Sequence, residues 1–455
     1  MSNQNNSTGA GAPAELARVL KLRSLVFYGV AFVIPLAFFT TYGIVTNTTH
    51  GHVSMTYVVA TLCMVFTAYS YCRMVKAFPK SGSVYTYATE TFNPYIGFIA
   101  GWTIVLGYMF LPMLNYLASA IFIQAALPSI PIWVWIVLFT VIVTGANLLG
   151  IKVADIFNNI VVVIQIIFLV ILLVMTVRFI TGSGLAIDLN AFYNSEEFAE
   201  IGGVKGIAAG AAIVCLAYLG FDGIATLGEE AINPKKNIPR AIMICCIGLG
   251  TLYVVFTYLL QAAWPTAWNE IENLDGGAVE VIAYVANTGM SYFFIAAYVV
   301  GCIAASISAV ASASRVLYGM GRDGLLPKKC FGYISPKFHV PSYNIIIMGA
   351  FGLTALFFSL TIASCLINFG ALLGFTFVNL SVIGHYYVKN KNRTAGDFFR
   401  HLLLPLVGAI YTMYMLINLS GTSIIYGIIW LVIGVIWLAI VTRGFKKSVT
   451  MSLDE

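Results

Sequence analysis

Apolar stretches long enough to cross a lipid bilayer recur along almost the whole chain. A membrane-spanning helix needs about 20 consecutive, mostly apolar residues. Twelve stretches reach or approach that length: Ser24–Thr46, Ser54–Cys72, Pro94–Leu127, Ile132–Leu149, Ile156–Ile180, Gly206–Leu227, Ala241–Ala263, Val281–Tyr318, Ser342–Leu360, Ile362–Tyr387, Leu402–Leu419 and Ser423–Val441. The pattern therefore predicts an all-α membrane protein with twelve transmembrane helices.

The composition excludes an ordinary water-soluble protein. Only 9% of the residues are charged and 60% are apolar, whereas about a quarter of the residues of a soluble domain are charged. The net charge of +6 comes from short basic clusters between apolar stretches, so it indicates contact with membrane lipid and no binding of nucleic acid. The chain contains no phosphate-binding loop, G-x-S-x-G turn or HExxH pair, so neither enzymatic activity nor a cofactor is predicted.

The distribution of Lys and Arg predicts the orientation, because cytoplasmic loops carry an excess of both. With a cytoplasmic N-terminus, all 24 basic residues except Arg178 and Lys205 fall on the cytoplasmic side. We therefore expect a multi-pass protein of the cell inner (plasma) membrane with both termini in the cytoplasm. The predicted parts are a tail (residues 1–23), a core of helices 1–10 (24–387), helices 11 and 12 (388–441) and a second tail (442–455).

Two of the predicted helices contain residues that interrupt a helix. Pro35 lies near the middle of helix 1, and Gly220 and Gly223 flank Asp222 in helix 6. Proline removes a helical hydrogen bond, and unwound backbone inside a membrane occurs where it lines a cavity or is buried in protein. Since the breaks are five helices apart, they predict an inverted repeat of helices 1–5 and 6–10, as in many secondary transporters. The alternative is a kink at Pro35 and close packing at the glycines.

Two motifs add a family resemblance. The segment LAYLGFDGIATLGEEAINPKKNIPRAI (216–242) and the segment SRVLYGMGRDGLLPK (314–328) resemble signatures of the amino acid–polyamine–organocation superfamily of permeases, and within it the putrescine importer group is most similar. The resemblance covers nearly the whole chain. It implies a five-plus-five inverted-repeat transport core with two extra C-terminal helices. It also implies proton-coupled uptake or exchange of a small amine or amino acid by alternating access.

The same resemblance bears on the substrate and the coupling ion. Putrescine importers carry Asp where this chain has Thr40 and Gly107, so one monoamine or zwitterionic amino acid is expected. A putrescine or polyamine importer remains the alternative. Some superfamily members carry a helix 5 lysine where this chain has Gln165, which excludes coupling through that lysine. A proton is the expected coupling ion, and sodium bound by Ser306 and Ser308 is the alternative.

Asp222 is the strongest candidate for a functional side chain, because a carboxylate in mid-membrane is costly to insert. It is expected to bind the substrate ammonium, to carry the coupling proton, or to cap the second half of helix 6. Tyr108 is expected to face the substrate through its ring or hydroxyl. The expected substrate-binding set is Ile34, Pro35, Ala37, Thr40, Tyr108, Ala217, Tyr218, Gly220, Phe221 and Asp222, and the coupling candidates are Asp222, Gln165, Ser306 and Ser308.

Two residues are candidates for gating. Phe38 is expected to cover the site, as are Tyr218 and Phe221. Glu230 is expected either to belong to a solvated cluster or to close an inner gate through an ion pair with Arg73 or another cytoplasmic base.

No metal site and no obligate protein partner are predicted. His50 and His52 lie in the first outer loop without Cys or acidic neighbours in sequence, and two histidines alone make a poor metal site. Of the competing functions, a channel requires a continuous polar pore, and a membrane-embedded enzyme requires at least two converging titratable groups. A non-transporting sensor of the same fold remains an alternative.

Overall fold

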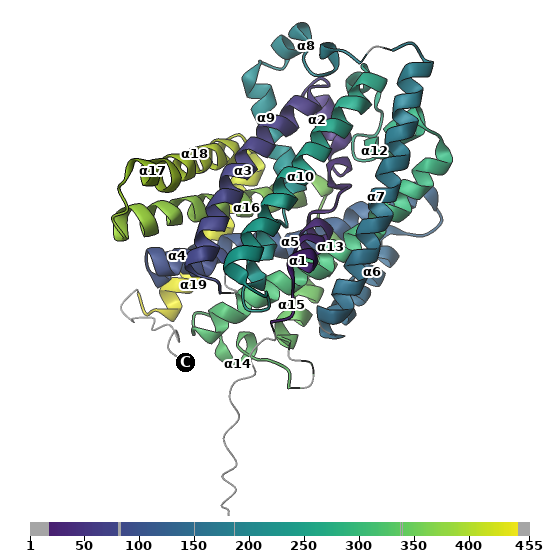
Figure 1. Ribbon diagram of the computed structural model, residues 1–455. Helices are drawn as coiled ribbons and strands as arrows, with labels where there is room; N and C mark the ends of the chain where they lie inside the picture. Colours follow the sequence, from purple (N-terminus) through teal and green to yellow (C-terminus); the bar gives the residue numbers. More distant parts are fainter. Residues whose placement is uncertain are drawn as a thin grey trace, which may run out of the picture.

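The computed structural model of the protein describes residues 18–80, 83–149, 151–185, 187–336, 338 and 340–444. Residues 1–17 and 445–455, which make up most of the two predicted tails, lie outside this part. Within it the regular elements are helices, and the one β-bridge is an isolated pairing of Leu20 with Ala231. The helices form one bundle with α8 and α14 at opposite ends (Figure 1).

The first part of the chain, up to the second break, contains α1 (Leu22–Val33), η1 (Ala37–Phe39), α2 (Tyr42–Thr48), α3 (Val53–Ala77), α4 (Ser83–Thr91), α5 (Pro94–Ala126), α6 (Ile132–Leu149), α7 (Ile151–Gly182), η2 (Leu189–Ala191), α8 (Ser195–Glu200), α9 (Val204–Val214), η3 (Cys215–Tyr218) and η4 (Asp222–Leu227). The remainder contains α10 (Pro234–Ala263), α11 (Ala267–Glu270), α12 (Gly277–Val285), α13 (Thr288–Arg322), α14 (Lys328–Phe331), α15 (Ser342–Gly352), η5 (Leu353–Phe357), α16 (Leu360–Val382), η6 (Ile383–Lys389), α17 (Ala395–Asp397), η7 (Phe398–Leu403), α18 (Leu404–Ile417) and α19 (Gly421–Val441).

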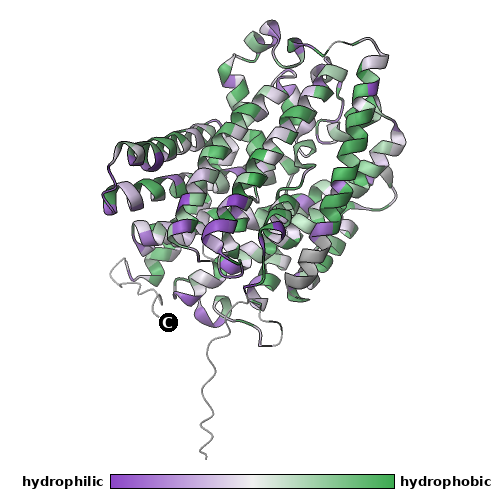
Figure 2. Cartoon of the chain, viewed as in Figure 1, coloured by the Kyte–Doolittle hydropathy of each residue, from purple (hydrophilic) through white to green (hydrophobic). Residues whose placement is uncertain are grey.

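Eleven helical segments of the described chain are long and apolar enough to cross a membrane. They correspond to eleven of the twelve predicted stretches. The twelfth, predicted at Ser342–Leu360, forms a shorter apolar helix at Ser342–Phe357. Hydrophobic residues predominate along the long helices, and hydrophilic residues gather at the helix ends and loops (Figure 2).

The segments differ in how much of their surface the protein covers. In the most apolar window of the Val204–Leu227 segment 89% of the residues are buried, against 17% for Gly421–Val441. Because α19 instead exposes apolar side chains such as Ile436, it is suited to face lipid, whereas the broken sixth segment lies inside the bundle. A site on the broken segment is therefore enclosed by protein.

Helix starts follow local capping chemistry. Asn93 and Asn287 each accept a hydrogen bond from a backbone N–H in the first turn, at the starts of α5 and α13 respectively, which satisfies a donor that has no partner within the helix. The cap at Asn287 also corrects one prediction. The stretch Val281–Tyr318 is not one helix, because α12 ends at Val285 and a new helix begins at Thr288.

Both predicted breaks are present. Helix α1 ends at Val33, and Ile34 adopts a φ of +64° directly before Pro35. A residue that precedes proline is disfavoured in the helical region, which explains why the helix stops there. Helix α9 passes into η3, Leu219 is extended, and Gly220 has a φ of +123° before η4 begins.

Candidate functional site

One tyrosine joins the two broken helices. The hydroxyl of Tyr253, on α10, lies 2.9 Å from the carbonyl oxygen of Ile34 and 3.1 Å from that of Ala217, so its single O–H proton is shared between two carbonyl acceptors. Both carbonyls lie where a helix stops, and the Ile34 carbonyl also accepts a hydrogen bond of 2.9 Å from the backbone N–H of Ala37. The contact therefore places the breaks of helices 1 and 6 side by side in the interior.

The glycines of the second break admit a large side chain from the first helix. A Cβ atom on Gly220 would lie 2.9 Å from the backbone carbon of Phe32, and one on Gly223 would lie 2.2 Å from the ring of Phe32. Real Cβ atoms do not approach so closely, so both positions require glycine here. The ring of Phe32 also lies 6.0 Å from that of Tyr108. Close packing at the glycines and a real break therefore coexist.

Asp222 lies at this junction and is fully buried. Its Oδ2 accepts a hydrogen bond of 2.5 Å from the Tyr108 hydroxyl, and its Oδ1 accepts one of 3.1 Å from the backbone N–H of Gly220. Phe221 occupies the cap position of η4 and makes no capping side-chain bond. The carboxylate thus holds the bend that precedes η4, and its role as a cap of the second half of helix 6 stays a prediction.

The charge of Asp222 is not balanced by a base. Among the residues that the structure describes, no Lys, Arg or His side chain forms an ion pair with this carboxylate. Hydrogen bonds from neutral donors stabilise a buried anion only partly, and buried charges are usually paired. The site is therefore suited to a cation that comes from outside the protein, or to a proton.

Other predicted substrate residues line the two breaks without contacting Asp222 through a hydrogen bond. Ile34, Pro35 and Ala37 form the helix 1 break, and the ring of Phe38 beside them lies 5.6 Å from the ring of Tyr253. These positions fit the prediction that Phe38 covers the breaks, although its gating role stays a prediction.

Three further predicted residues have partners of their own. The Thr40 hydroxyl lies 2.8 Å from the Tyr298 hydroxyl, and the Tyr218 hydroxyl lies 2.5 Å from that of Thr61. The ring of Phe221 packs at 5.9 Å from Tyr71. Hydrogen bonds thus join Asp222 to Tyr108 and Gly220. Thr40, Tyr218 and Phe221 instead contact residues of other helices.

Sequence reasoning missed Tyr253 and Phe32. Nothing in the sequence around Tyr253 distinguishes it from the other tyrosines of the apolar helices. For Phe32 the sequence offers one weak indication. Gly220 and Gly223, three residues apart, leave room for a bulky side chain on a facing helix.

Glu230 is not part of a solvated cluster, and its partner is not Arg73. The Glu230 side chain is almost fully buried, and its Oε1 lies 3.0 Å from the Nε of Arg315 on α13. Arg73 instead contacts His401 and lies over the ring of Tyr386. Glu230 therefore forms its ion pair with Arg315, which takes the place of Arg73 among the bases considered from the sequence.

The coupling candidates do not converge on one point through the contacts of the described residues. Ser306 accepts a hydrogen bond from Asn115 at 3.2 Å, and Ser308 accepts one from Asn158 at 3.4 Å. Gln165 donates to the carbonyl of Ala297, while its buried Oε1 has no hydrogen-bond partner. A shared ion site at these residues therefore stays a prediction.

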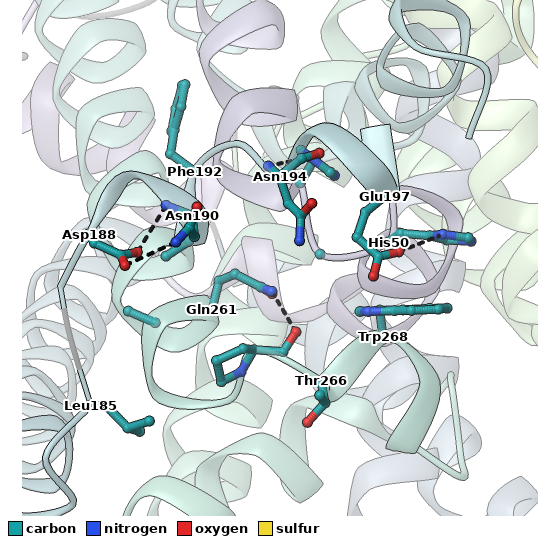
Figure 3. Close-up of a pocket in the computed structure, with 15 residues that line it drawn as sticks. His50, Leu185, Asp188, Asn190, Phe192, Asn194, Glu197, Gln261, Thr266 and Trp268 are labelled. Atoms are coloured by element: carbon teal, nitrogen blue, oxygen red, sulfur yellow. Dashed lines mark hydrogen bonds and ion pairs between the residues drawn. The ribbon is translucent and has the colours of Figure 1, made fainter. Parts of the chain in front are cut away.

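A pocket of about 360 Å³ opens at the α8 end of the bundle. Asp188, Gln261 and Trp268 are among its lining residues (Figure 3). His50 lines it too, with its Nδ1 3.3 Å from a carboxylate oxygen of Glu197. The premise that the histidines of the first loop lack acidic neighbours is therefore wrong for His50, because the fold brings α8 to it.

Comparison with known proteins finds matches along nearly the whole chain. A family model described as "Amino acid permease" matches residues 24–448. The low-affinity putrescine importer PlaP of Escherichia coli strain K12 is 37% identical over 454 residues, which cover 99% of each chain. The methylthioribose transporter of Bacillus subtilis is 26% identical over 92% of each chain, and the branched-chain amino acid permease BcaP of the same organism is 25% identical over 95% of this chain and 94% of its own.

Proposed function

Because the chain belongs to the amino acid permease family of membrane transporters, we propose that it takes up one small amine or amino acid by secondary active transport, with Asp222 as the group that binds the substrate ammonium. The observation that carries the proposal is the buried, unpaired Asp222 carboxylate between two broken helices. An ammonium group at this point forms an ion pair with the carboxylate and lies beside the ring of Tyr108.

The transport cycle follows from the two breaks. Helices 1–5 and 6–10 form an inverted repeat of a twelve-helix protein, in which Ser342–Phe357 supplies the short ninth crossing and both termini are cytoplasmic. The Tyr253 contacts at both breaks support this arrangement, because they keep the unwound segments together at the junction of the repeats. Movement of the bundle of helices 1, 2, 6 and 7 against the rest of the protein exposes Asp222 alternately to each side of the cell membrane.

The coupling ion in this proposal is a proton that Asp222 carries when no ammonium is bound. Of the carboxylates buried in the described residues, Glu230 already has Arg315 as its partner and Asp222 has none. When no substrate is bound, the proton neutralises the Asp222 carboxylate, which the substrate ammonium otherwise neutralises. Sodium near Ser306 and Ser308 is the alternative, since their hydroxyl oxygens are suitable ligands.

One carboxylate matches one ammonium, so a monoamine or a zwitterionic amino acid is the proposed substrate. The Thr40 hydroxyl already has a partner in Tyr298, and Gly107 offers no side-chain group at all. The similarity to a putrescine importer over nearly the whole length favours a diamine as the second candidate. In that case the second ammonium is held by aromatic rings and carbonyl oxygens.

Uptake by purified protein in liposomes tests the proposal with radiolabelled putrescine, monoamines, and neutral and basic amino acids. The pH gradient is imposed in both directions, because a proton that alternates with the substrate on Asp222 moves outward as the substrate enters, whereas a co-transported proton enters with it. Gradient-dependent uptake of a monoamine or neutral amino acid, with putrescine inert, is the expected result. Putrescine uptake would select the second candidate. Absence of uptake of every compound, under both proton and sodium gradients, would contradict the transport function and favour a sensor.

A further inference from the structure

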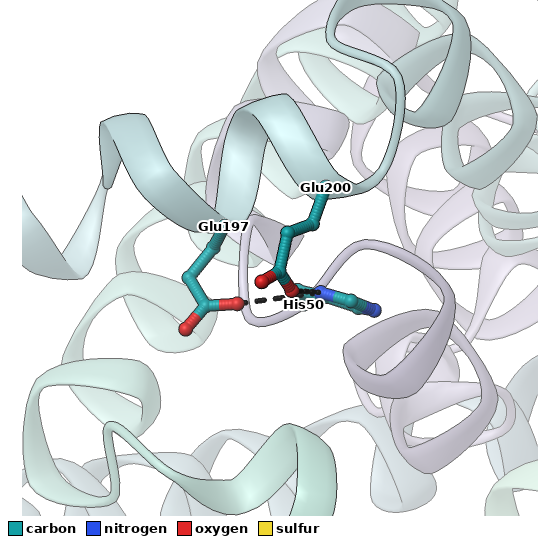
Figure 4. Close-up of side chains that lie close together, drawn as sticks. All are labelled: His50, Glu197 and Glu200. Carbon is teal, nitrogen blue, oxygen red and sulfur yellow. Dashed lines mark ion pairs between the residues drawn. The ribbon is translucent and has the colours of Figure 1, made fainter.

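Three side chains that are far apart in sequence converge at the α8 end of the bundle. His50 follows α2, and its Nδ1 lies 3.3 Å from an oxygen of Glu197 and 3.3 Å from an oxygen of Glu200, both on α8 (Figure 4). We propose that these three residues form a binding site for a divalent transition-metal ion, for which Zn²⁺ is the probe.

The spacing of the donor atoms fits such an ion. The nitrogen and the two oxygens lie within 4.8 Å of one another. Zinc binds histidine nitrogen and carboxylate oxygen at about 2.0–2.2 Å with tetrahedral geometry, which separates neighbouring ligand atoms by about 3.3–3.6 Å. The two observed separations of 3.3 Å are at the lower end of that range. Small side-chain rotations therefore suffice to close the site.

The local structure positions the ligands before an ion arrives. Glu197 and Glu200 are three residues apart on α8, so both project from the same helical face. The imidazole of His50 stacks on the indole of Trp268, with ring centroids 4.2 Å apart and planes 12° apart. That contact limits rotation of the ring, and a rigid ligand loses less freedom when it binds an ion.

The donor atoms themselves lack other partners. His50 Nδ1 and Glu197 Oε2 are shielded from solvent, and neither makes a hydrogen bond in the described structure. Gln261, which is buried and lines the same pocket, also has an oxygen without a hydrogen-bond partner. Buried polar atoms normally have partners. Apart from the contacts of His50 with Glu197 and Glu200, these atoms have none in the described structure, so the group keeps lone pairs for an ion. The pocket beside them leaves room for the water that completes a three-ligand zinc site.

The competing explanation is a simple ion pair between protonated His50 and the two carboxylates. It predicts no selective metal affinity. The neighbouring His52 does not compete as a ligand, because its two nitrogens already contact the backbone of Thr49 and Asn194.

Calorimetric titration with Zn²⁺ tests the site on the full chain, purified without a histidine tag and embedded in lipid nanodiscs. The unaltered protein is expected to bind one ion, and Glu197→Gln, which keeps the shape of the side chain, is expected to lower the affinity at least tenfold. His50→Ala removes the nitrogen ligand and is expected to have an equal or larger effect.

The matched control is Glu196→Gln, since Glu196 is exposed on the same short helix and the variant loses the same charge. It is expected to bind Zn²⁺ as tightly as the unaltered protein. Thermal unfolding without metal verifies that all variants are folded, and added Zn²⁺ raises the unfolding temperature of the unaltered and control proteins alone. Equal zinc affinity in all proteins, or no binding by the unaltered protein, would overturn the proposal in favour of the ion pair.

Discussion

Replacement of Asp222 by asparagine separates the binding role of this residue from its structural role. The carboxylate accepts one hydrogen bond from Tyr108 and one from Gly220. An asparagine keeps one acceptor oxygen for Gly220, and its amide nitrogen faces a tyrosine hydroxyl that is able to turn and accept. The fold is therefore expected to persist, because the substitution preserves volume and removes a buried charge.

The effect on the substrate is larger. Removing one partner of a buried, hydrogen-bonded charge pair costs roughly 2–5 kcal/mol. At 1.4 kcal/mol for each factor of ten, this range corresponds to a loss of affinity between roughly 30-fold and several thousand-fold. Asparagine also has no titratable proton in the physiological range, so any remaining uptake should no longer respond to an imposed pH gradient.

Two measurements on the same preparation test this reasoning. Substrate binding to detergent-solubilised Asp222→Asn protein gives the change in affinity, and uptake into liposomes with and without a pH gradient gives the change in coupling. Glu196→Gln is a control for the loss of one carboxylate elsewhere. Unaltered affinity together with an unaltered gradient response in the Asp222→Asn variant would remove Asp222 from the mechanism. A large loss of affinity with an unaltered gradient response would leave Asp222 a binding role and exclude its role in proton coupling.

Three further predictions use residues of the same framework. Tyr108→Phe removes a hydrogen bond to a charged group, worth about 1.5–3 kcal/mol, and should weaken substrate binding at least tenfold in the same assay while the protein stays folded. Glu230→Arg and Arg315→Glu should each abolish uptake, because each leaves a buried pair of like charges, and the double reversal should restore part of it; failure of that rescue would exclude a gating pair. Gly220→Ala places a side chain at a φ of +123° and should destabilise the protein by about 1–3 kcal/mol in thermal unfolding, whereas Gly248→Ala on an open helix surface should not.

The backbone breaks could be predicted from the sequence because their causes are local. Pro35 and Gly220 act on the chain through their own geometry, so their positions alone indicated where helices 1 and 6 stop. The expectation that Asp222 is a functional residue has a local cause too, the cost of a charge in an apolar segment, and it stays a prediction. Its hydrogen bonds to Tyr108 and Gly220 only specify how the bend is held.

Long-range pairs could not be predicted, since nothing local specifies them. Arg315 lies 85 residues from Glu230, and Arg73 was an equally good candidate by charge alone. The same holds for His50 and Glu197, because the sequence shows a histidine in one loop and a carboxylate in another without the fold that brings them together. The ninth predicted stretch, Ser342–Leu360, was also longer than the apolar helix Ser342–Phe357 of the structure, since apolar composition continues through the loop that follows η5.

The two helix breaks have an electrical consequence beyond the backbone groups that Tyr253 contacts. Each break leaves the C-terminal end of one helical segment, which carries a partial negative charge, next to the N-terminal end of the following segment, which carries a partial positive charge. Here α1 ends where η1 begins, and η3 ends shortly before η4. The core thus presents both signs of charge before any side chain is counted. A zwitterion carries both signs too, so this backbone polarity favours an amino acid over a diamine.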